Sequence, residues 1–167
     1  NSLAETATDD ITVTIAAGCG GTKKYVTPNS VTGGYNSYYS TSSGYQPGDT
    51  IVLQASYNPW GYFGFGSVAG TAACPIIVMQ EGGQVTLKDG IAFENVQYVK
   101  VLGNLGGLQY GFKVESNLAD PNNVAIGIAK KSRNVEVSNV YVTNAEYGCW
   151  IKNEAECDTT INYPNWW

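Results

Sequence analysis

The sequence predicts an all-β fold, a right-handed parallel β-helix in which short strands wind into stacked coils. The first observation is an internal repeat, because Tyr110-Gly111 recurs as Tyr147-Gly148 and Gly90-Ile91-Ala92 recurs as Gly127-Ile128-Ala129, each 37 residues later. Residues 98–101 match residues 134–137 at a separation of 36. Repeats of about 20–50 residues are typical of solenoids, in which each coil buries its apolar face against its neighbours.

The second observation is the pattern of strands and corners. From residue 85 onward, short β-branched and aromatic stretches are separated by single asparagines, and no long window has the 3.6-residue period of a helix. Asparagine suits tight corners because it tolerates positive φ. Tight Asn-Gly hairpin turns are missing from the sequence, which disfavours an antiparallel meander. We therefore expect three short strands per coil and almost no helix.

The composition agrees with this fold and excludes some partners. The chain has 167 residues, of which 43% are hydrophobic and only 14% are charged, and 20 are glycines. Its length fits one domain. The net charge is −5 and the only basic pairs are Lys23-Lys24 and Lys130-Lys131, so nucleic acid is not expected as a partner. No segment approaches the roughly 20 apolar residues of a membrane-spanning helix.

The N-terminal part of the chain is expected to lie outside the regular coils. Residues 1–10 are polar, and we interpret them as a disordered tether or tag remnant. Residues 11–15 alternate with period two, which predicts a strand. Residues 23–45 are rich in Tyr, Ser, Thr and Gly, which predicts a long surface loop. Residues 11–45 are therefore expected to cap the solenoid with one strand and this loop.

The coils are expected over residues 46–167. Pro47-Gly48 forms a turn before the β-branched run 50–53, and residues 75–79 form a continuous apolar run, as in a covered parallel strand. Further strands are expected over 85–87, 91–93, 98–102, 111–114, 124–128, 135–137, 140–142 and 147–151. Trp166-Trp167 is not preceded by a polar capping coil, so we expect the natural protein to continue, or further coils or a partner chain to cover this end.

Three segments carry a resemblance to a known family. The turn Pro47-Gly48-Asp49 leads into a strand that Tyr57 follows, and residues 70–78 and 90–101 look like the next coil. Over residues 46–153 the chain thus resembles the first coils of secreted bacterial β-helix proteins of the pectate-lyase-like superfamily. The resemblance implies the N-terminal portion of a longer solenoid, outside the cell or on its surface. The superfamily includes lyases, hydrolases, epimerases, tailspikes and adhesins, so it does not decide the function.

Four cysteines bear on the cellular compartment. Cys19, Cys74, Cys149 and Cys157 allow three pairings and lack C-x-x-C spacing. Cys149 with Cys157 would close a short loop, and Cys19 with Cys74 would then tie the N-terminal region to an early coil. The alternatives are four buried free thiols or a zinc site that needs all four thiolates. We expect at least one disulfide, hence an oxidising extracellular or periplasmic setting.

Aromatic residues are candidates for contact with sugars. Flat rings pack on the apolar faces of pyranoses, while phenol and amide groups form hydrogen bonds. The alternative is that these rings pack in the core or cap the first coil. The candidate rings are Trp60, Tyr62, Phe63, Phe65, Trp150, Trp166 and Trp167.

A charged strip is predicted beside these rings. The 37-residue repeat would place Lys113 on Trp150 and Glu115 on Lys152, with Glu154 adjacent. We interpret this strip as a ladder of solvent-facing ion pairs. The alternative is a lysine base that removes the proton next to a uronate carboxylate. The predicted carbohydrate-binding residues are Trp60, Tyr62, Lys113, Trp150 and Lys152.

No catalytic residue or cofactor is predicted. The chain has no His, so it has no Ser–His or Cys–His dyad, and no lyase motif of the superfamily can be matched residue by residue. Calcium is the alternative, because carboxylates are its usual ligands, although their spacing is not that of an EF-hand. We interpret most of these carboxylates as solvated. The acidic candidates are Asp89, Glu94, Asp120, Glu154, Glu156 and Asp158.

Together these observations predict an extracellular module that contacts polysaccharide and performs no chemistry in this segment. One alternative is the N-terminal part of a polysaccharide lyase or glycoside hydrolase whose active site lies on coils beyond Trp167. Another is a structural or adhesive subunit of the cell surface whose open ends stack on partners.

Overall fold

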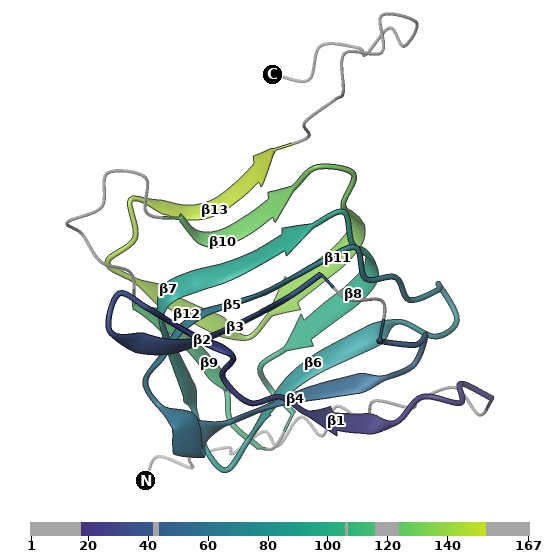
Figure 1. Cartoon of the computed structure of the whole chain (residues 1–167), viewed down its shortest axis with the longest axis horizontal. Coiled ribbons are helices and arrows are strands. Elements are labelled where there is room, and N and C mark those ends of the chain that lie inside the picture. The colour runs from purple at the N-terminus through teal and green to yellow at the C-terminus, as the bar shows by residue number, and fades with distance from the viewer. Residues whose placement is uncertain (1–17, 42–43, 106, 116–123, 153–167) are drawn as a thin grey trace, which may run out of the picture.

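The computed structural model describes residues 18–41, 44–105, 107–115 and 124–152, which form a parallel β-solenoid (Figure 1). Successive turns of the chain add one strand to each sheet, so that segments far apart in sequence pair in parallel. The predicted fold class is confirmed. Among the described residues, the only helical element is the short 3-10 turn η1 (Ala55–Tyr57), as the absence of a 3.6-residue period predicted.

One sheet has five parallel strands. Its order is β1 (Lys23–Tyr25), β4 (Thr50–Gln54), β6 (Ile76–Glu81), β8 (Gln97–Leu102) and β11 (Arg133–Ser138). Equivalent side chains stack in columns, and one inner column contains Ile51, Val78, Val101 and Val137. The predicted 36-residue match is confirmed here, because Val99 lies opposite Val135.

The second sheet begins as one surface and then divides. Its early strands are β2 (Ser30–Thr32), β3 (Tyr35–Ser40), β5 (Trp60–Gly66) and the long β7 (Val85–Glu94). After the positive φ of Gly90, β7 changes direction. Its first half pairs with β9 (Phe112–Glu115), on which β12 (Val140–Thr143) stacks, and its second half pairs with β10 (Val124–Ala129), on which β13 (Tyr147–Lys152) stacks. The last two turns therefore have three strands each, as predicted.

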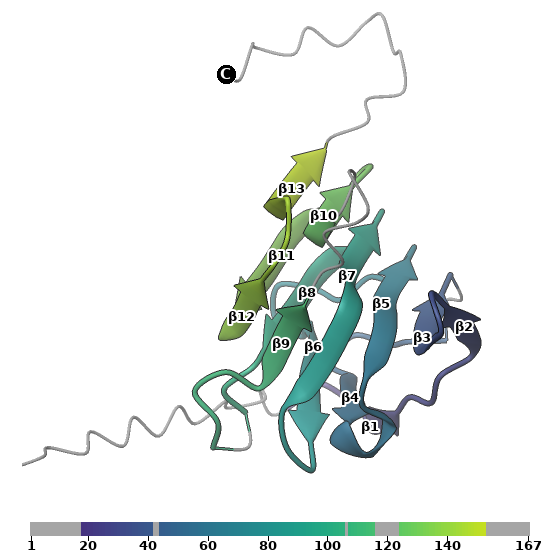
Figure 2. The ribbon, with the colours of Figure 1, turned by 90° about the vertical axis from the view of Figure 1, so that its left-hand side faces the viewer.

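The stack runs from the β2–β3 hairpin at one end to β11, β12 and β13 at the other (Figure 2). Within residues 23–45, for which the sequence predicted a long surface loop, β1 and β3 join the first turn. The reason is that tyrosine rings supply apolar surface there, and Tyr38 stacks on Phe63 with 5.9 Å between ring centroids. The predicted tether 1–10 and strand 11–15 lie outside the described residues.

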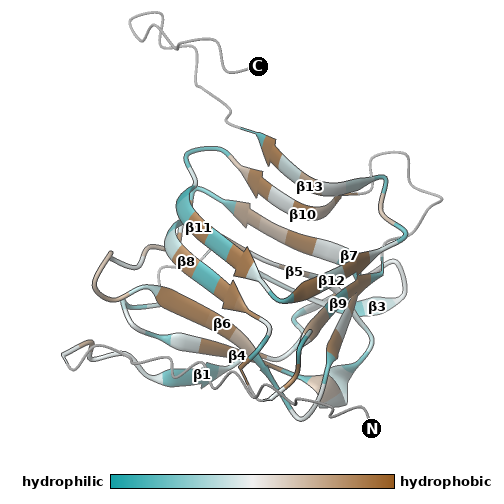
Figure 3. Ribbon diagram, turned by 180° about the vertical axis from the view of Figure 1, so that it is seen from behind, coloured by the Kyte–Doolittle hydropathy of each residue, from teal (hydrophilic) through white to brown (hydrophobic). Residues whose placement is uncertain are grey.

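The core fills the space between the sheets. Apolar residues recur along the strands of both sheets (Figure 3). The inward ones are buried in the earlier turns, whereas those of the last turn, such as Val137 and Val142, are partly buried. Phe63, Phe65 and Phe93 form a continuous aromatic cluster, with 5.1 and 5.5 Å between successive ring centroids. Burial of each such ring contributes about 1.5–3 kcal/mol relative to exposure. This core fixes which side of each strand faces outward.

Four of the predicted asparagine corners are confirmed. Asn95, Asn134, Asn139 and Asn144 have φ values of +54°, +54°, +54° and +58°, in the left-handed region that asparagine tolerates better than most residues. Corners of successive turns also bond to each other, since the Asn95 side chain donates to Ser67 Oγ at 3.3 Å. These corners let the chain turn between sheets without long loops.

The 37-residue repeat does not describe the second sheet correctly. Lys113 lies opposite Tyr141, 28 residues later, and not opposite Trp150, so the predicted stacking of Lys113 on Trp150 and Glu115 on Lys152 is wrong. Tyr110-Gly111 precedes β9, whereas Tyr147-Gly148 begins β13. The two copies of this motif therefore belong to strands in different parts of the turn.

A disulfide joins Cys19 to Cys74, with 5.6 Å between their Cα atoms, as one predicted pairing requires. Cys149 is a free, exposed thiol, and Cys157 lies outside the described residues. No helix in the described part of the chain is long and apolar enough to cross a membrane.

Candidate functional site

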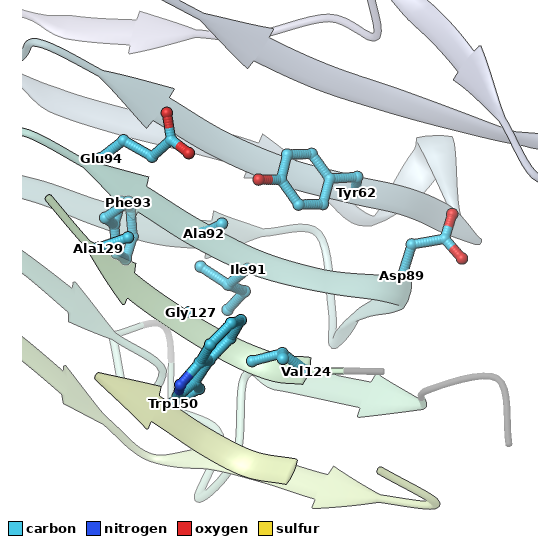
Figure 4. A pocket seen from close by; sticks show the side chains of 10 residues that line it. All are labelled: Tyr62, Asp89, Ile91, Ala92, Phe93, Glu94, Val124, Gly127, Ala129 and Trp150. Carbon is cyan, nitrogen blue, oxygen red and sulfur yellow. The ribbon is translucent and has the colours of Figure 1, made fainter. Parts of the chain in front are cut away.

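An open groove of about 270 Å³ lies on the outer face of the second sheet (Figure 4). Strands β7 and β10 form its floor, Tyr62 of β5 forms one wall and Trp150 of β13 forms the other. Neighbouring strands are about 4.8 Å apart, so the backbones of these walls are separated by roughly 14 Å. The complete lining is Tyr62, Asp89, Ile91, Ala92, Phe93, Glu94, Val124, Gly127, Ala129 and Trp150.

The floor is low because parallel pairing places small residues in one row. Gly64, Ala92, Gly127 and Trp150 lie opposite one another on β5, β7, β10 and β13. Along this row, from β5 to β13, three small residues are followed by the large indole of Trp150. A Cβ added at Gly127 would meet only ordinary contacts, the nearest at 3.7 Å. Any larger side chain at this position would occupy the groove itself.

Tyr62 is a half-buried wall with a polar tip. Its ring lies beside that of Tyr39, with centroids 6.0 Å apart, and it crosses above Gly64. Burial, reinforced by Tyr39 and Glu94, raises the pKa of Tyr62 to about 12. The hydroxyl therefore stays protonated at neutral pH. It forms no hydrogen bond with the residues that the structure describes, and so remains open to a ligand.

Trp150 is the exposed wall. Its residue surface is 49% exposed, and its ring leans over the floor near Gly127 and Val124 (Figure 4). The ammonium of Lys152 lies 5.6 Å from the ring centroid, a cation–π contact that helps to hold the indole in place. The groove is thus open above and apolar below.

Carboxylates stand at the two ends of the groove. Glu94 Oε2 accepts the Tyr39 hydroxyl at 3.3 Å and lies 2.6 Å from the Lys130 ammonium. Glu94 Oε1 has no hydrogen bond within the described residues. Asp89 stands at the opposite end (Figure 4). Rings, a phenol and carboxylate oxygens can stack on a ligand and form hydrogen bonds with it.

Trp60 is not part of this site, and its predicted contact with sugar is wrong. The residue is completely buried, and its indole N–H donates to Gln54 O at 3.0 Å. In a regular strand Trp60 and Tyr62 would share a face. The β5–β7 register shifts between them, so Trp60 enters the core while Tyr62 faces outward.

The predicted lysines separate in space. Lys152 lies at the groove beside Trp150, whereas Lys113 lies on β9, which pairs with the other half of β7. There the ammonium groups of Lys113 and Lys88 both bind Glu115 and, in that order of importance, lower its pKa. The structure therefore brings together Tyr62, Trp150 and Lys152 of the five predicted residues.

Sequence reasoning missed the small residues of the floor and the role of Glu94 at the rim. Their signal is the spacing of outward positions, 28 residues from Gly64 to Ala92 and 35 from Ala92 to Gly127. Among the described residues, no three His, Cys, Asp or Glu side chains gather as metal ligands. The calcium candidates Asp120, Glu154, Glu156 and Asp158 lie outside the described residues.

Comparisons of the chain with models of known protein families, with curated proteins and with solved structures found no match.

Proposed function

We propose that this chain is an extracellular polysaccharide-binding module whose ligand occupies the groove between Tyr62 and Trp150. The observation that carries the proposal is the row of Gly64, Ala92 and Gly127 leading to Trp150. It creates a flat apolar floor between two aromatic walls. Such a shape accepts a sugar ring better than a compact apolar ligand, because it leaves one side of the ligand in water.

The chemistry of the lining also suits a sugar. Pyranoses have apolar C–H faces and a rim of hydroxyl groups, so they need flat rings together with a few neutral or anionic hydrogen-bonding atoms. Trp150 supplies an exposed ring, and Tyr62 supplies both a ring and a hydroxyl. Glu94 adds an acceptor for sugar hydroxyls.

Two further observations support the extracellular setting and the family. The Cys19–Cys74 disulfide suits an oxidising compartment. The β-solenoid fits the sequence resemblance to bacterial members of the pectate-lyase-like superfamily, whose membership we include in the proposal. Among the described residues, the groove lining contains no His, Cys or Lys, and the proposal is limited to binding.

A binding experiment with matched variants tests the proposal. The wild-type chain is titrated calorimetrically with oligosaccharides of equal length from a panel of neutral and acidic polysaccharides. Trp150→Ala should weaken binding about tenfold, because an exposed ring that stacks on a ligand contributes about 1–2 kcal/mol. Tyr141→Ala is the control, since Tyr141 is also 49% exposed but lies on β12, away from the groove.

Filling the floor provides a second variant. Gly127→Leu should abolish binding without unfolding the chain, because a Cβ at Gly127 makes only ordinary van der Waals contacts and the φ of Gly127 is not positive. Thermal unfolding checks that each variant is folded. Equal affinities of the wild type, Trp150→Ala and Gly127→Leu would contradict the proposal, as would failure of the wild type to bind any glycan of the panel.

A further inference from the structure

The charges around the groove are distributed unevenly. Among the described residues, the charged side chains of the lining are Asp89 and Glu94, and the lining contains no lysine or arginine. The two nearby ammonium groups are engaged at its edge. That of Lys130 lies 2.6 Å from Glu94 Oε2, and that of Lys152 lies over the Trp150 ring.

The open hydrogen-bonding atoms have a matching preference. Glu94 Oε1 can only accept a hydrogen bond, so it requires a hydroxyl or amine donor from the ligand. The Tyr62 hydroxyl can donate or accept. Neither Glu94 Oε1 nor the Tyr62 hydroxyl forms a hydrogen bond with another residue in the described part of the chain. A ligand carboxylate near Glu94 would meet a like charge and would offer no donor.

We propose that the groove selects an uncharged, hydroxyl-rich glycan and disfavours uronates. This inference rests on the proposed function and names the ligand class of the same site. Selection arises partly from repulsion. The carboxylates of the groove repel a uronate, which lowers its affinity relative to a neutral sugar that stacks equally well on the rings. The preference is the opposite of what a uronate-binding site would require, namely cations in the lining.

The test compares charged with uncharged probes. Oligogalacturonate and its fully methyl-esterified form share one backbone, and oligosaccharides of glucose, mannose and xylose extend the neutral set. In low salt at pH 7, neutral probes should bind the wild type at least about tenfold more tightly than free-acid probes. Added salt should narrow this ratio, because it screens the repulsion.

Glu94→Gln should raise the ratio of uronate to neutral affinity about 3- to 10-fold, because it removes the nearest like charge and releases Lys130. Glu136→Gln is the matched control. It makes the same change in a lysine-paired carboxylate, 2.7 Å from Lys100 on the five-strand sheet, and should leave the ratio unchanged.

The outcomes separate this inference from the proposed function. Tighter binding of free uronates, or a ratio that Glu94→Gln does not move, would overturn the charge selection while groove binding stands. Binding of no probe by the wild type would overturn the proposed function, and the charge selection with it.

Discussion

Replacing Asp49 by asparagine tests how the first two turns of the solenoid are joined. The Asp49 carboxylate is buried under the turn that precedes β4. Its Oδ1 accepts the Thr22 N–H at 2.8 Å, and its Oδ2 accepts the Gln46 N–H at 2.8 Å and lies 2.8 Å from the Lys24 ammonium. One side chain thus holds the turn, the preceding segment and a lysine of β1 together.

The expected loss of stability follows from these contacts. Asparagine keeps one acceptor oxygen, but its amide N–H₂ group would face donors, namely the Gln46 N–H and the Lys24 ammonium, that bind Oδ2 in the wild type. A hydrogen bond to a charged group contributes about 1.5–3 kcal/mol, and removing one partner of a buried ion pair costs about 3–5 kcal/mol. Lys24 is 32% exposed and can turn to water. Asp49→Asn should therefore lower the free energy of unfolding by about 2–4 kcal/mol.

Urea denaturation at several pH values measures this loss. For an m value of about 2 kcal/mol/M, the midpoint should fall by about 1–2 M. Burial alone would raise the pKa of Asp49, but the N–H of Gln46, the Lys24 ammonium and the N–H of Thr22 together hold this pKa below its ordinary value. A depressed folded-state pKa gives stability above about pH 4 that disappears as pH falls through the folded pKa. The difference between wild type and variant should therefore shrink only below about pH 4.

Glu136→Gln is the control for a generic loss of charge. Its partner Lys100 and Glu136 itself have side chains 42% and 47% exposed, and an exposed pair contributes at most about 1 kcal/mol. A loss below about 1 kcal/mol for Asp49→Asn, or a difference that persists unchanged to pH 2, would refute the reasoning.

Two more predictions concern a corner and the disulfide. Asn95→Ala should destabilise the chain by about 1–2 kcal/mol because φ of Asn95 is +54°. Asn95→Gly should be about as stable as the wild type. A Gly variant that unfolds at a lower temperature than the Ala variant would contradict this prediction. The paired variant Cys19→Ser/Cys74→Ser should lose about 2–4 kcal/mol, because the bond closes a loop of 55 residues. Reductant should lower the free energy of unfolding of the wild type to that of the variant and should not affect the variant. A wild type whose stability does not respond to reductant would count against this prediction.

The fold could be predicted because its signals are local. Each corner needs a residue that tolerates positive φ, and asparagine supplies it at Asn95, Asn134, Asn139 and Asn144. Strands β8 and β11 keep one separation of 36 residues over their paired positions, so Val99 and Val135 could be paired from the sequence. Both signals survive without knowledge of distant contacts.

The second sheet could not be predicted as well, because its two halves have different separations within the same turn. Equivalent positions are 28 residues apart between Lys113 and Tyr141 but 23 apart between Gly127 and Trp150, since the connections differ in length. A short motif such as Tyr-Gly then recurs at positions that do not pair. For the same reason the floor of the groove, made of residues with little chemistry of their own, could not be recognised.

The shift in register between Trp60 and Tyr62 has a consequence for how this surface could change. Inward and outward positions alternate along a strand, and the shift reverses that alternation in the middle of β5. If Gly61 were deleted, Trp60 and Tyr62 would become neighbours in the strand, and regular alternation alone would then place one ring inside and the other outside. The outward position of the phenol therefore depends on the irregular register only because Gly61 separates the two rings.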